Sequence, residues 1–95
     1  MAEDRVTWDV LVKGRVTGVG FRFAAVREAG RYPDLGGFVR NRSHDTVEAL
    51  LQGPREQVQG FLGWLKKGPP AADVRAVDVK ELDTGRTYLE FDISY

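Results

Sequence analysis

The segment of the chain best suited to chemistry is Gly14–Arg22, with the sequence GRVTGVGFR. It holds three glycines, and because glycine adopts positive φ without steric cost, successive backbone N–H groups can turn toward one point. Arg22 stands at the start of an expected helix, where its planar guanidinium can donate to two phosphate oxygens. The free amides and dipole of a helix N-terminus also attract anions. The segment therefore predicts a phosphate or carboxylate site between a strand and a helix.

Two nucleotide-binding motifs do not fit this loop. A P-loop needs Lys and then Ser or Thr after its last glycine, whereas Gly20 is followed by Phe21 and Arg22. The Rossmann pattern G-x-G-x-x-G is matched by Gly18 and Gly20, but its third position is Phe23. Taken alone, a glycine-rich loop more often marks only a tight turn, here followed by a solvated arginine.

The segments around the loop predict a small α+β domain. Strands are expected over residues 7–13, 37–42 and 46–52, the last two as a hairpin, and a first helix over residues 21–32. A second helix is expected to open at Gly53-Pro54 and to carry Lys66, Lys67 and Gly68 at its C-terminal end. The strand-like segments VRAVDVKEL and YLEFDISY follow. We interpret this order as β-α-β-β-α-β, the ferredoxin-like fold, a four-stranded antiparallel sheet with two helices on one face and the first and third strands central. The fold hosts many functions and does not define an activity.

Composition narrows the class of protein. A length of 95 residues predicts a single domain, 1–95, and the absence of cysteine excludes disulfides, thiolate catalysis, zinc-thiolate sites and iron–sulfur clusters. Fourteen basic residues balance fourteen acidic ones, so no net field favours nucleic acid or an anionic membrane. No apolar run reaches the ~20 residues of a membrane span, and the N-terminal MAEDRVTWDV lacks the pattern of a secretory signal. We expect a cytoplasmic, soluble monomer.

The motifs together resemble one family along nearly the whole chain. GRVTGVGFR, GFVRN, TVEALLQG, FLGWLKKGPPAADV and YLEFDISY, in this order and spacing, are similar to the acylphosphatase family. The resemblance implies hydrolysis of the carboxyl-phosphate bond of small acyl phosphates, with inorganic phosphate as product or inhibitor. It also implies that Arg22 binds the phosphate and that Asn41 positions the attacking water. The backbone amides implied to complete the phosphate site are those of Arg15, Val16, Thr17, Gly18, Val19 and Gly20.

The chemistry of that reaction suits these residues. Phosphoryl transfer depends mainly on positioning and charge stabilisation, and a carboxylate leaving group needs little protonation. We therefore expect no general acid, cofactor or metal, with a phosphate oxygen of the substrate accepting the proton of the water. Three departures from the family pattern are Thr17 in place of glutamine, a turn one residue longer around Pro33, and Phe38 in place of tryptophan.

Two alternatives to an enzyme stay open. A non-catalytic ferredoxin-like module could keep the glycine-rich loop to bind a phosphorylated or carboxylate ligand. Binding of single-stranded RNA on the exposed sheet is disfavoured by the zero net charge and by the lack of an RNA-recognition string. Among other polar residues we expect His44 to be solvated, and Glu48 and Glu90 to form cross-strand ion pairs rather than a catalytic pair.

Overall fold

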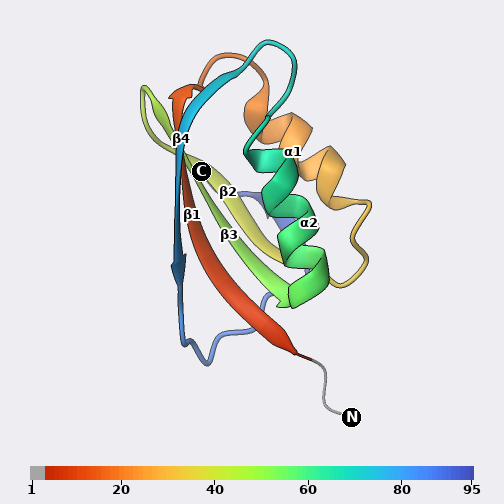
Figure 1. Cartoon of the computed structure of the whole chain (residues 1–95). Helices are drawn as coiled ribbons and strands as arrows, with labels where there is room; N and C mark the ends of the chain where they lie inside the picture. Colours follow the sequence, from red (N-terminus) through yellow and green to blue (C-terminus); the bar gives the residue numbers. More distant parts are fainter. Residues whose placement is uncertain (1–3) are drawn as a thin grey trace.

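The computed structural model describes residues 4–95 and forms two layers, a sheet covered on one face by two helices (Figure 1). Residues 1–3 of the expected domain and of the N-terminal segment tested for a secretory signal lie outside the described residues. The elements in chain order are β1 (Arg5–Arg15), α1 (Phe21–Ala29), β2 (Gly36–Ser43), β3 (Thr46–Pro54), α2 (Arg55–Leu65), β4 (Asp73–Glu81) and β5 (Phe91–Ile93).

The sheet has the order β4-β1-β3-β2-β5. Its first four strands pair antiparallel, with β1 between β4 and β3, so the ferredoxin-like α+β fold is confirmed. The expectation of four antiparallel strands lacked one element: β5 adds a short fifth strand, which runs parallel to β2. Both segments after α2 form strands, but they lie at opposite edges of the sheet.

The crossing from β4 to β5 is fixed by Gln52, a buried residue of β3. Its side-chain amide donates to the Thr7 hydroxyl at 3.0 Å and to the Arg86 carbonyl at 2.8 Å, and its carbonyl accepts from the Tyr88 amide at 2.7 Å. Only residues 91–93 of the strand-like segment YLEFDISY form a strand: Leu89 is 91% exposed, whereas the two apolar residues of β5 pack on the core.

The core lies between the sheet and the helices. Along β3, Val47, Ala49 and Leu51 alternate toward the helices, and each is fully buried. The other residues of 4–95 with no exposed surface come from β1, β2, the two helices and the loop after β1: Val10, Val12, Val39, Ala25, Val58, Phe61, Leu65 and Val16. Trp8 and Trp64 pack against this core.

The first helix is shorter than predicted. It ends at Ala29 instead of extending to residue 32, because Gly30 weakens the helix and Pro33 cannot continue it. Tyr32 then folds back onto α2, where its ring meets Phe61 edge to face at 6.0 Å. The lengthened turn is held to α2 by Gln57, which accepts from the backbone N–H of Asp34 at 3.0 Å.

Candidate active site

The loop between β1 and α1, residues 15–20, is called the cradle loop below. Gly18 and Gly20 have φ of 71° and 75°, whereas Thr17 and Val19 keep negative φ, so the sign of φ alternates along the loop. Alternation of this kind turns consecutive N–H groups into a concave anion-binding nest. A Cβ at either glycine would meet nothing within 4 Å. The backbone conformation, rather than crowding, therefore explains why glycine stands at both positions.

The cradle loop is tied to the core and to the β2–β3 turn. Val16 is fully buried and Val19 packs against the core. At the start of the loop, the backbone N–H of Gly14 donates to the Asp45 carbonyl at 2.9 Å. Within it, the Thr17 hydroxyl donates to the His44 carbonyl. Thr17, one of the departures from the family pattern, therefore joins the cradle loop to the turn that follows Asn41.

Helix α1 opens directly from this loop. Within residues 4–95, its N-terminus has no side-chain cap and no acidic residue in its first turn. The Ala24 amide donates to the Gly20 carbonyl at 3.0 Å, so the amides of Phe21, Arg22 and Phe23 precede the first turn of helical hydrogen bonds. These amides extend the nest, and their dipole favours a negative charge.

Arg22 and Asn41 lie at the same end of the sheet. The Arg22 side chain is half-buried, and its Cζ atom is 5.5 Å from the centre of the Tyr95 ring. Asn41 is exposed near the end of β2, and strand alternation puts it on the same helix-side face as the buried Val39. Because Val39 pairs in parallel with Ile93, the chain that continues to Tyr95 runs alongside the end of β2 that carries Asn41.

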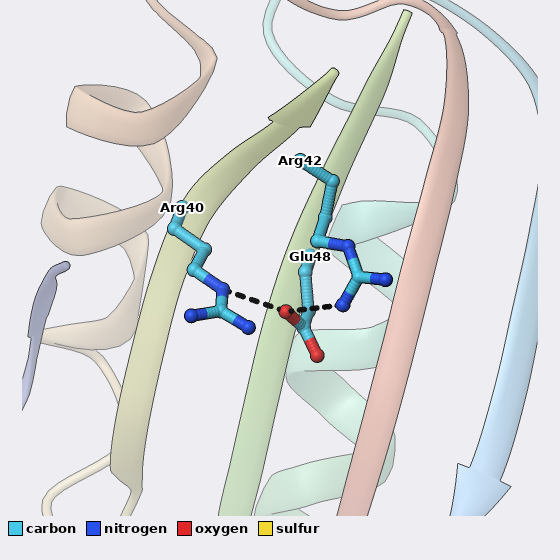
Figure 2. Close-up of polar contacts among 3 residues, drawn as sticks. All are labelled: Arg40, Arg42 and Glu48. Atoms are coloured by element: carbon cyan, nitrogen blue, oxygen red, sulfur yellow. Dashed lines mark hydrogen bonds and ion pairs between the residues drawn. The ribbon is translucent and has the colours of Figure 1, made fainter. Parts of the chain in front are cut away.

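The other face of the sheet carries a charged cluster. Glu48 of β3, whose side chain is 7% exposed, accepts at Oε1 from Arg40 Nε at 2.7 Å and from Arg42 Nη1 at 3.3 Å (Figure 2). The expected cross-strand ion pairing of Glu48 is thus confirmed. Arg40 also stacks on Phe38, with Cζ 5.4 Å from the ring centre.

Asp9 of β1 completes this cluster, and sequence reasoning did not single it out. Burial, then a hydrogen bond to Glu48 and repulsion from its charge, raise the pKa of Asp9 to about 6. Burial alone would raise the pKa of Glu48, but hydrogen bonds from Asp9 and Arg40 outweigh burial and hold that pKa below its usual value. Within residues 4–95 the Oδ1 atom of Asp9 is buried without a hydrogen-bond partner. The signal in the sequence was a carboxylate between the apolar Trp8 and the apolar run 10–12.

Other candidate residues stay at the periphery. The His44 side chain is exposed, as expected, and Arg15 is exposed where β1 enters the cradle loop. Over the described range no three His, Cys, Asp or Glu side chains gather in a way that could hold a metal ion. None of the helices in that range is long and apolar enough to cross a membrane.

The fold and this loop define a ferredoxin-like α+β domain with a glycine-rich loop of alternating φ at a helix N-terminus. Comparisons with known proteins specify it further. The sequence model of the acylphosphatase family, "Acylphosphatase", matches residues 8–93. The chain is 47% identical over 85 residues to an acylphosphatase of Burkholderia cenocepacia, covering 90% of this chain and 86% of that protein.

Solved structures agree with the sequence match. The chain is similar to the crystal structure of acylphosphatase from Bacillus subtilis, with a TM-score of 0.87, 36% identity, and coverage of 95% of this chain and 99% of that one. It is also similar to 12% of full-length HypF, with a TM-score of 0.87, 25% identity and all of this chain covered. The chain belongs to the acylphosphatase family. It is a hydrolase of that class, and its substrates are small acyl phosphates.

Proposed function

We propose that the cradle loop and Arg22 bind the phosphoryl group of an acyl phosphate and that Asn41 orients the water that attacks it. The amides of residues 15–20 and the first turn of α1 surround the phosphoryl oxygens, and the Arg22 guanidinium supplies the positive charge. Asn41 offers one donor and one acceptor group, which suits a residue that holds a water in line with the leaving oxygen.

The reaction follows from these groups. The water oxygen forms a bond to phosphorus while the bond between phosphorus and the carboxyl oxygen breaks, and the electron pair leaves with the carboxylate. The transition state is loose, with its charge on the equatorial phosphoryl oxygens, where the amides and Arg22 stabilise it. A phosphoryl oxygen accepts the proton of the water, since Asn41 is not a base. The products are a carboxylate and inorganic phosphate.

The observation that carries this proposal is the alternation of φ along residues 17–20, which leads into an uncapped helix whose second residue is Arg22. These features bind an oxyanion irrespective of what is attached to it. The acyl group is therefore bound less specifically than the phosphate, which favours a broad range of small acyl phosphates.

The experiment is hydrolysis of benzoyl phosphate in the presence of EDTA by the wild type, Arg22→Ala and Asn41→Ala. Each substitution removes one preorganised group, so kcat/KM should fall by roughly 10²-fold or more. Arg31→Gln is a matched control, because Arg31 is an exposed arginine whose ion pair within residues 4–95 is with Glu28 of α1. Inorganic phosphate should inhibit the wild type competitively, and Arg22→Ala should weaken that inhibition.

The outcomes separate enzyme from binding module. Wild-type protein that binds phosphate through Arg22 but does not hydrolyse benzoyl phosphate would support a non-catalytic module. Activity that survives Arg22→Ala unchanged would remove that residue from the site. A metal requirement revealed by EDTA would contradict the assignment of all charge stabilisation to Arg22 and the amides.

A further inference from the structure

The charged cluster on the open face of the sheet lies directly behind the strand end that carries Asn41. Asn41 stands between Arg40 and Arg42 in β2, and both arginines reach across to one oxygen of Glu48 (Figure 2). Arg40 lies opposite Glu48 in the β2–β3 register. The three residues, Arg40, Glu48 and Arg42, are called the β2 clamp below.

The geometry of β2 changes within the clamp. Asn41 pairs with Val47 and Ser43 with Thr46, so Arg42 is an extra residue in a β-bulge. A bulge breaks the regular ladder and redirects neighbouring side chains, and bulges occur often beside active sites. Here the bulge lets Arg42 reach the carboxylate that Arg40 also holds. The clamp therefore fixes the backbone on both sides of Asn41.

Beyond the clamp, this strand end is held at the β2–β3 turn, where Gly14 and Thr17 donate to the carbonyls of Asp45 and His44. Residues 41–45 are all exposed, and β5, which covers the outer edge of β2, ends its pairing at Val39. Glu48 is different, because its carboxylate is almost fully buried and a charge in such a place is costly unless it is paired and hydrogen-bonded. Two guanidiniums on one oxygen, together with the hydrogen bond from Asp9, satisfy that need.

We infer that Glu48 is a positioning residue for the hydrolysis: by holding Arg40 and Arg42 on one face, it sets the direction of the Asn41 side chain on the other. The inference rests on the proposed role of Asn41. Phosphate binding and placement of the water are then tasks of different parts of the molecule: the cradle loop and Arg22 bind phosphate, and the clamp affects only the placement of the water. Loss of the clamp should lower kcat and leave KM almost unchanged.

The test is a double-mutant cycle with benzoyl phosphate. Glu48→Gln keeps the size and one oxygen acceptor of the side chain but removes its charge, and we expect kcat to fall about 10-fold, the scale of a small misplacement of a reacting group. KM and the inhibition constant of inorganic phosphate should change less than about twofold, because ground-state binding is untouched. In an Asn41→Ala background the same substitution should lower kcat no further.

A second variant protects the test against misfolding. Arg42 is half exposed, so Arg42→Gln leaves the core intact, and it should lower kcat about threefold, again without further effect in the Asn41→Ala background. Arg31→Gln serves as the matched surface control. Circular dichroism and urea unfolding establish that each variant is folded.

The results distinguish failure of this inference from failure of the proposed function. If Asn41→Ala lowers kcat but Glu48→Gln and Arg42→Gln do not, the clamp has no positioning role. The same holds if the effects multiply in the double variants or if Glu48→Gln raises KM instead of lowering kcat. If Asn41→Ala itself keeps full kcat, the role of Asn41 is wrong and the inference about Glu48 is overturned with it.

Discussion

Replacing Gly20 by alanine tests whether the left-handed backbone of the cradle loop binds the phosphate. Gly20 has a φ of 75°, and a Cβ there would meet nothing within 4 Å, so the substitution adds no clash. The whole cost is conformational, about 1–2 kcal/mol for an L-residue in this region. If the nest binds phosphate, the phosphate-bound variant must keep residue 20 in the left-handed conformation, so its free energy is raised by this amount.

The cost is divided between two measurable quantities. If the free loop keeps its shape, the free energy of unfolding falls; if the loop relaxes, phosphate binding weakens, by roughly 5- to 30-fold for the full amount. The assays are urea unfolding and the inhibition constant of inorganic phosphate against benzoyl phosphate. The two losses should add up to about 1–2 kcal/mol, because the bound conformation is the same in either case.

Gly63→Ala is the matched control. Gly63 lies inside α2, and a Cβ there also meets nothing within 4 Å, but helical backbone favours alanine over glycine by about 1 kcal/mol. This variant should be more stable than the wild type and should bind phosphate equally well. Gly20→Asn should cost less than Gly20→Ala, since asparagine enters the left-handed region more readily. Unchanged stability and unchanged phosphate inhibition in Gly20→Ala would refute the backbone argument.

Three further predictions concern other parts of the molecule. Asp9→Asn should stabilise the protein more at pH 8 than at pH 4.5, as measured by urea unfolding. Burial and the neighbouring Glu48 raise the pKa of Asp9 in the folded protein from its ordinary value of 3.8 to about 6, so ionisation of Asp9 costs stability as the pH rises through that range. A stability difference that does not change with pH would contradict this. Thr17→Val should lower the free energy of unfolding by about 1 kcal/mol through loss of the hydrogen bond to the β2–β3 turn, whereas Thr17→Ser should retain most of it. Gly37→Ala should lower the free energy of unfolding the most, by about 3 kcal/mol or more, because its Cβ would stand 1.7 Å from the Leu50 carbonyl oxygen at a φ of 134°. A soluble variant with wild-type thermal stability would show that the close approach is easily relieved.

Much of the fold could be predicted because its signals are local. The alternation of Val47, Ala49 and Leu51 and the apolar stripe of α2 each specify a buried face within one element. The position of β5 could not be predicted in this way. YLEFDISY has the alternation of a strand, but its neighbour in the sheet depends on Gln52, which lies far back in the sequence and holds the crossing segment.

The candidate site shows the same division. The glycines of the cradle loop and the arginine after them predict an anion site by themselves, whereas the part assigned to Asn41 came only from the family resemblance. The hydrogen bond from Thr17 to the β2–β3 turn and the shared contacts of Glu48 require the register of three strands. No pattern within one segment carries that information, so the contacts that position the site could not be predicted from the sequence.

The place of β1 in the sheet has a consequence for how the protein folds. Trp8 pairs with Leu51 on one side and with Glu81 on the other, so the first strand gains its second neighbour only when almost the whole chain has come together. Chains dominated by pairings between distant segments fold slowly, because the entropy of closing long loops is lost before the contacts form. A fragment that ends before β3 would contain the cradle loop and Arg22 but would lack the strand and the turn against which they are held. The proposed anion site should thus form late in folding, and inorganic phosphate should slow unfolding far more than it speeds refolding.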